Sequence, residues 1–135
     1  MIIIDYNGIA ISNIITQKLD IDENLIRHMI LNSIRMYRSQ FKEEYGEIVL
    51  AYDSKHYWRR DFYPYYKKNR KKARENDNNN WEQIFECLKR IKQELKDYLP
   101  YKHLEVQGAE ADDIIAVLAK NIDEKMLIVS GDKDF

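Results

Sequence analysis

Met1-Ile2-Ile3-Ile4-Asp5, residues 1–5, is the stretch that decides the fold class. An unbroken run of mostly β-branched residues predicts a strand buried on both faces, which is typical of a parallel sheet. Further strands are predicted at 47–52 and 126–130, with a weaker one from His103 to Val106. Because helical patterns separate these strands, we expect an α/β fold with a mostly parallel sheet flanked by helices, in one domain over residues 1–135.

Three stretches between the strands have the period of amphipathic helices. Asp20 and Glu23 have the spacing of a capping box. The helix after them places six apolar residues on one face: Ile26, Met29, Ile30, Ile34, Tyr37 and Phe41. A second helix, 81–99, is predicted to bury Trp81, Ile84, Phe85, Leu88, Ile91, Leu95 and Tyr98, and Pro100 ends it. A third runs from about 109 to 120.

Acidic residues stand after three of the strands and in the first turn of the third helix: Asp5, Asp53, Asp132, Asp134, Glu110, Asp112 and Asp113. The carboxyl ends of parallel strands meet at one edge of a sheet, so we expect these acids to lie together. Any one Asp after a strand is equally well explained as a turn residue, but the repetition favours a shared site. Helical spacing puts Glu110 and Asp113 on one side and leaves open which acid of that helix reaches a metal.

A cluster of carboxylates requires bound cations. Two like charges about 4 Å apart repel by about 4 kcal/mol at an effective dielectric constant near 20. Sites built only from oxygen ligands favour hard cations. We therefore predict Mg²⁺ binding at this edge, with Mn²⁺ as a substitute.

Residues 55–74, KHYWRRDFYPYYKKNRKKAR, form a basic and aromatic stretch that begins just after Asp53. Its nine Lys and Arg residues are suited to phosphate contacts, and its aromatic residues can stack unpaired bases at ~1–3 kcal/mol each. A solvated loop whose aromatic residues pack on the domain is the alternative. The position beside the acids favours nucleic acid, and metal-bound carboxylates next to such a segment indicate a phosphodiester hydrolase.

The composition excludes several classes of protein. The net charge of −1 gives no overall basic field, and the single Cys87 excludes internal disulfides and fits a reducing compartment. No apolar run reaches transmembrane length, so we expect a cytoplasmic protein without a membrane partner. His28, His56 and His103 do not join the acids, and we expect them in packing or at the surface.

Six motifs stand out together: Ile4-Asp5, Tyr52-Asp53, Tyr57-Trp58-Arg59-Arg60-Asp61-Phe62, Tyr65-Tyr66-Lys67-Lys68-Asn69-Arg70, Glu110-Ala111-Asp112-Asp113 and Ser130-Gly131-Asp132-Lys133-Asp134-Phe135. In this order and spacing they resemble the phage 5′ nucleases of the flap endonuclease family. The resemblance implies a PIN-like, resolvase-like domain with a basic helical arch at about 55–80. It also implies a metal-dependent 5′→3′ exonuclease and flap endonuclease of DNA replication, which removes RNA primers and 5′ flaps from lagging-strand fragments in the cytoplasm of a bacterial host.

The resemblance implies roles for individual residues. Asp5, Asp53, Asp112 and Asp132 would surround a first Mg²⁺, with Glu110 and Asp113 close by and Asp134 at a second. Lys67 matches the family's active-site lysine and Arg70 its basic partner at the phosphate. The remaining nucleic-acid contacts would come from Arg59, Arg60, Tyr65, Tyr66, Lys68, Lys71, Lys72 and Arg74.

The resemblance also implies partners. These are DNA with 5′ single-stranded ends or flaps, RNA–DNA hybrid, and a replication single-strand-binding protein or clamp. The family pattern continues beyond the position of Phe135, so we expect a fragment or a split protein completed by a C-terminal polypeptide. Two other functions stay open: a non-catalytic nucleic-acid-binding subunit that needs this complementing chain, and a PIN-type endoribonuclease, against which the basic arch argues.

Overall fold

The computed structural model describes residues 1–17, 22–54 and 81–130. Four strands are found in these ranges: β1 (Ile2–Asp5), β2 (Ile48–Tyr52), β3 (Lys102–Glu105) and β4 (Leu127–Val129). The helices are α1 (Tyr6–Gln17), α2 (Glu23–Tyr45), α5 (Trp81–Tyr98) and α6 (Ala111–Asn121). The predicted arch at 55–80 lies outside the described residues.

The four strands form one parallel sheet in the order β3-β2-β1-β4. Ile2 of β1 is paired with Ile48 of β2 on one side and with Leu127 of β4 on the other. Because every described pairing is parallel, the carboxyl ends of all four strands lie at the same edge. This confirms the predicted α/β class and its parallel sheet.

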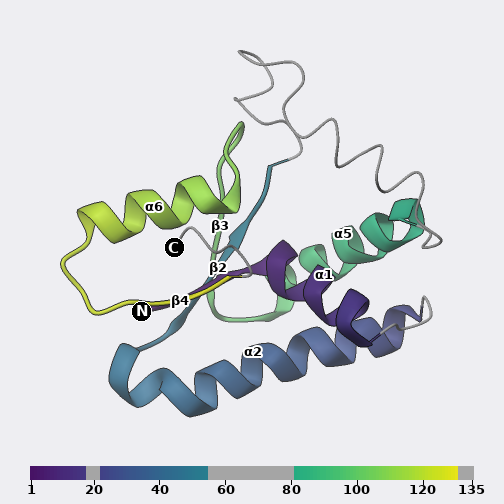
Figure 1. Cartoon of the computed structure of the whole chain (residues 1–135), viewed down its shortest axis with the longest axis horizontal. Coiled ribbons are helices and arrows are strands. Elements are labelled where there is room, and N and C mark those ends of the chain that lie inside the picture. Colours follow the sequence, from purple (N-terminus) through teal and green to yellow (C-terminus); the bar gives the residue numbers. More distant parts are fainter. Residues whose placement is uncertain (18–21, 55–80, 131–135) are drawn as a thin grey trace.

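Helices cover both faces of the sheet, as Figure 1 shows. Ile2 and Ile4 of β1 pack into a core with α1, α2 and α5, whereas Ile3 packs with Ala111, Ile114 and Ile115 of α6 on the opposite face. Successive side chains of a strand point to opposite faces, so a strand between two helical layers must be apolar throughout. This explains the unbroken apolar run at the start of the chain.

Helix α2 begins later than the sequence predicted. Its N-cap is Asp22, whose carboxylate accepts hydrogen bonds from the amides of Asn24 and Leu25 at 3.0 and 3.4 Å. The predicted capping box from Asp20 to Glu23 was therefore wrong, because the side chain that accepts from the first free amides is that of Asp22. The predicted apolar face is confirmed at its centre: Ile26, Ile30 and Ile34 are buried.

Helix α5 buries most of its predicted face, namely Ile84, Leu88, Ile91 and Leu95. The prediction that two further residues are buried was wrong, since Phe85 is 37% exposed and Tyr98 is 82% exposed. Phe85 lies at the margin of the apolar stripe, one residue from Ile84, and Tyr98 is the last residue of the helix. In the part of the chain that the structure describes, no helix is both long and apolar enough to cross a membrane.

Candidate metal centre

The carboxyl edge of the sheet gathers polar side chains from three neighbouring strands. Asp5 is the last residue of β1, Asp53 follows β2, and Ser130 follows β4. Asp5 is paired with Ala51, which places Asp53 two residues farther along the adjacent strand. The Ser130 hydroxyl donates to Oδ2 of Asp5 at 3.4 Å, so the end of β4 reaches the same point.

Asp53 is held by donors on both of its carboxylate oxygens. The backbone amide of Ala111 donates to Oδ1 at 2.6 Å, and Nδ2 of Asn7 donates to Oδ2 at 3.1 Å. Ala111 is the first residue of α6, where free amides and the helix dipole favour a negative charge. Asp53 thus links β2 to the start of α6 and to the start of α1.

A short loop secures the same junction. The amide of Ser54 donates to the carbonyl of Ala109 at 2.9 Å, and the amide of Gly108 donates to the Ser54 hydroxyl at 3.2 Å. Gly108 has a φ of 83°, a left-handed conformation that glycine adopts without steric cost. The residues around Asp53 are therefore fixed to the N-terminus of α6 from both sides.

Asp5 is held by the first turn of α1. The amide of Gly8 donates to Oδ1 of Asp5 at 3.2 Å. A Cβ atom at position 8 would lie only 2.8 Å from Oδ2 of the same carboxylate, so the close approach depends on glycine. This residue was not singled out in the sequence, although its place three residues after a strand-end Asp is a signal for such a contact.

The acids of α6 occupy different positions. Glu110 is the N-cap residue and is 3% exposed, whereas Asp112 and Asp113 are half-buried. Oδ2 of Asp113 accepts a hydrogen bond from the backbone amide of Glu110 at 3.0 Å, so Asp113 caps its own helix. The structure therefore gives Asp113 a capping role, and it brings α6 to the site through the Ala111 amide.

The carboxylates of Asp5, Asp53 and Asp113 are thus each engaged by nearby donors. Within residues 1–17, 22–54 and 81–130, no three His, Cys, Asp or Glu side chains are grouped closely enough to hold a metal ion together. Two predicted ligands, Asp132 and Asp134, lie outside these ranges, as do Lys67, Arg70 and the other predicted nucleic-acid contacts. The complete ligand set and the basic site stay predictions, and the oxygen donors of Asp5 and Asp53 suit a hard divalent cation.

Two buried tyrosines flank the candidate ligands in the sequence. Tyr6 follows Asp5 and donates to the carbonyl of Leu88 at 2.6 Å. Tyr52 precedes Asp53, and its hydroxyl lies 2.8 Å from Nδ1 of His103. Burial raises the pKa of both phenols well above the usual range, so both stay protonated and act as structural hydrogen-bonding groups.

The expected packing role of His103 agrees with the structure, and Cys87 lies in the core. His103 takes part in packing, because its ring stacks on that of Tyr52 with centroids 5.9 Å apart. Its Nε2 lies 3.1 Å from the carbonyl of Leu99. Cys87 is buried, and burial raises the pKa of its thiol, which makes it a poor nucleophile.

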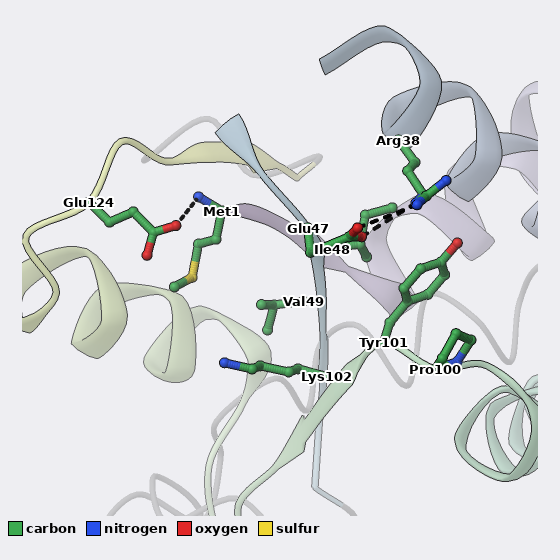
Figure 2. Close-up of a pocket in the computed structure, with 9 residues that line it drawn as sticks. All are labelled: Met1, Arg38, Glu47, Ile48, Val49, Pro100, Tyr101, Lys102 and Glu124. Atoms are coloured by element: carbon green, nitrogen blue, oxygen red, sulfur yellow. Dashed lines mark hydrogen bonds and ion pairs between the residues drawn. The ribbon is translucent and has the colours of Figure 1, made fainter. Parts of the chain in front are cut away.

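A cavity of about 450 Å³ lies at the opposite, amino-terminal edge of the sheet (Figure 2). Its acids are already paired: Glu47 with Arg38 at 3.3 Å, and Glu124 with the Met1 ammonium at 2.9 Å. A smaller cavity of about 150 Å³ is lined by Gly8 and Ser130, both of which contact Asp5. The smaller cavity therefore adjoins the candidate metal centre, and the larger one does not.

Residues 2–135 match the model of the family described as 5′-3′ exonuclease, N-terminal resolvase-like domain. The chain is therefore a 5′-3′ exonuclease-type, resolvase-like domain, and it belongs to that family. The chain is also 44% identical to the Ribonuclease H of Enterobacteria phage T4 over 142 residues, which cover 98% of this chain and 47% of that protein. The family resemblance inferred from the motifs is confirmed.

Solved structures agree on the fold. A T5 5′-exonuclease with bound zinc ions matches with a TM-score of 0.72 at 20% identity, over 99% of this chain and 49% of that one. A T5 flap endonuclease in complex with DNA and metal ions matches with a TM-score of 0.72 at 19% identity, over 98% of this chain and 48% of that one. The chain spans about half the length of the relatives that it matches.

Proposed function

We propose that the chain is the N-terminal part of a Mg²⁺-dependent 5′→3′ exonuclease and flap endonuclease. Its substrates would be DNA with 5′ single-stranded ends or flaps and RNA–DNA hybrid, and its role the removal of RNA primers and 5′ flaps in the cytoplasm of a bacterial host. The observation that carries the proposal is the placement of Asp5 and Asp53 on adjacent parallel strands, with the N-terminus of α6 bonded to Asp53, in a chain of this family.

In this proposal Asp5, Asp53, Asp112 and Asp132 would hold the first Mg²⁺, and Asp134 would belong to a second. When bound, these ions supply Lewis-acid activation of the phosphate and of water. Lys67 and Arg70 offset the charge that develops on the scissile phosphate, and Tyr66 stacks on a nearby base. The products are a 5′-phosphate and a 3′-hydroxyl.

The other basic residues of 55–74 bind the nucleic-acid backbone, and a single-strand-binding protein or clamp is a further candidate partner. A second candidate function is a nucleic-acid-binding subunit that turns over substrate only with a complementing polypeptide. The basic and aromatic composition of residues 55–74 supports nucleic-acid binding by such a subunit.

The experiment that tests the proposal is cleavage of 5′-tailed duplex DNA in Mg²⁺ or Mn²⁺. The purified chain is assayed alone and with a polypeptide that corresponds to the remaining half of the relatives, and Asp53→Asn serves as the inactive control. Cleavage from the 5′ end that is lost in Asp53→Asn and in EDTA supports the nuclease. Binding without cleavage by the chain alone, with cleavage after addition of the second polypeptide, supports the subunit. Hydrolysis of RNA that has no free 5′ end, with none of 5′-tailed DNA, would favour an endoribonuclease instead.

A further inference from the structure

The first turn of α1 contacts both candidate ligands, although they come from different strands. Nδ2 of Asn7 donates to Asp53 at 3.1 Å, and the amide of Gly8 donates to Asp5 at 3.2 Å. Asn7 and Gly8 are consecutive residues, so a single rigid turn sets the positions of two carboxylates at once. Neither residue belongs to the acidic set.

These contacts orient the carboxylates. An ionised carboxylate has about four lone-pair directions, so one donor on each oxygen of Asp53 uses about two of them. Asp53 has one donor on each oxygen, from Ala111 and Asn7, and Asp5 has Gly8 on Oδ1 and Ser130 on Oδ2. Two donors on opposite oxygens fix the rotation of the carboxylate plane.

The two donors from this turn are also electrically neutral. A Lys or Arg in the place of Asn7 would neutralise Asp53 and repel an incoming cation, whereas an amide leaves its negative charge available. Gly8 contributes because it has no side chain: a Cβ atom at this position would lie 2.8 Å from the Asp5 carboxylate. The turn thus contacts both carboxylates without adding a charge.

We propose that Asn7-Gly8 is the positioning element of the metal centre: Asn7 orients Asp53, and Gly8 makes room for Asp5. This inference rests on the proposed metal-dependent function. Groups that hydrogen-bond to metal-ligating side chains typically change metal affinity by about 10–100-fold when they are removed. Asn7→Ala should therefore weaken divalent metal binding by about this factor.

The test measures the dissociation constant for Mn²⁺ from the electron paramagnetic resonance signal of the free ion, well below the melting temperature and without DNA. We expect a dissociation constant about 10–100-fold larger for Asn7→Ala than for the unsubstituted chain. Asn121→Ala is the matched control, because Asn121 is the last residue of α6, at the other end of that helix from Ala111, and its amide donates to the carbonyl of Val117 at 2.8 Å. Its affinity for Mn²⁺ should equal that of the unsubstituted chain.

Gly8→Ala tests the second contact, and circular dichroism checks that this variant is folded under the conditions of the measurement; Ala is otherwise more favourable than Gly inside a helix. It should nevertheless weaken Mn²⁺ binding, since the new Cβ displaces the Asp5 carboxylate. A double-mutant cycle identifies the route of action: in an Asp53→Asn background, Asn7→Ala should have little further effect, because its partner is already changed.

Three outcomes overturn the inference. Equal Mn²⁺ affinity of Asn7→Ala and the unsubstituted chain would show that Asn7 does not position Asp53. An undiminished effect of Asn7→Ala in the Asp53→Asn background would show that it acts elsewhere. Absence of Mn²⁺ binding by the unsubstituted chain would overturn the metal centre itself, and with it the proposed function.

Discussion

The hydroxyl of Tyr52 and Nδ1 of His103 lie 2.8 Å apart, and this contact joins β2 to β3 directly beside Asp53. Nε2 of His103 lies 3.1 Å from the carbonyl of Leu99, which can only accept a hydrogen bond. Nε2 therefore carries the proton, and Nδ1 accepts from Tyr52. The residue before a candidate metal ligand is thus tied to the neighbouring strand by a buried side chain.

Tyr52→Phe should lower the free energy of unfolding by about 1 kcal/mol, because it removes one hydrogen bond and leaves Nδ1 of His103 without that donor. Urea denaturation would measure this as a lower midpoint with an unchanged slope. Tyr98→Phe is the matched control, since Tyr98 is 82% exposed and its substitution should change stability by less than about 0.5 kcal/mol. Equal midpoints for the two variants would contradict a structural role for the Tyr52–His103 contact.

Mn²⁺ or Mg²⁺ should raise the melting temperature of the chain, because a cation that binds only the folded state stabilises it. The gain is about 2.7 kcal/mol at a concentration 100 times the dissociation constant. Asp5→Asn and Asp112→Asn should each reduce the rise, measured by differential scanning fluorimetry across a metal titration. Asp97→Asn on α5, whose carboxylate accepts from Gln93 at 3.0 Å, is the control and should leave the rise unchanged. A melting temperature that does not respond to either metal would count against the site.

Glu105 should make a contribution to stability that disappears in acid. Burial acts to raise the pKa of its carboxyl group, but hydrogen bonds from Lys92 and Lys96 outweigh burial and hold the pKa below its usual range. A carboxyl pKa lowered by folding stabilises the protein above the unfolded-state value, about 4.3, and this stabilisation is lost as the pH falls through the folded-state value.

Glu105→Gln should therefore be less stable than the unsubstituted chain at pH 7, and the difference should shrink as the pH is lowered from about 5 toward 3. Urea denaturation at a series of pH values measures it. Glu86→Gln, an exposed position on α5, should show no such pH-dependent difference. A gap between Glu105→Gln and the unsubstituted chain that stays constant with pH would rule out the ion pairs as its source.

Lys67→Ala should lower the rate of 5′-tailed DNA cleavage by about 100-fold or more, because removing one preorganised group that stabilises developing charge typically costs about 10²–10³ in kcat. Single-turnover kinetics, with the complementing polypeptide present where it is needed, would measure the effect. Lys89→Ala, an exposed lysine of α5, should leave the rate unchanged. Equal rates for the two variants would remove Lys67 from the catalytic set.

Local sequence patterns were sufficient to predict the strands and the parallel sheet. The apolar runs of β1 and β2 predicted buried parallel strands because a strand covered on both faces needs apolar residues at every position. The direction of the sheet then placed Asp5 and Asp53 at one edge without any knowledge of contacts. The helical period predicted the positions of α5 and α6, but it did not predict that Phe85 and Tyr98 are exposed. The period identifies the apolar face of a helix, whereas the extent of the covering elements decides how much of that face is buried.

The sequence by itself thus determined the fold class, the family motifs and the edge of the sheet at which the acids lie, since these follow from hydrophobic period and strand direction. Only the tertiary structure decided which groups hold the acids in place. Asp53 accepts hydrogen bonds from Asn7, 46 residues away in the chain, and from the amide of Ala111, 58 residues away. The tertiary structure also decided that the absence of a side chain at Gly8 makes room for the Asp5 carboxylate. It further decided that residues 6–17 form a helix, although this segment contains β-branched residues, which have a low intrinsic helix propensity. These outcomes depend on packing between segments far apart in the chain, and no local pattern encodes such distances.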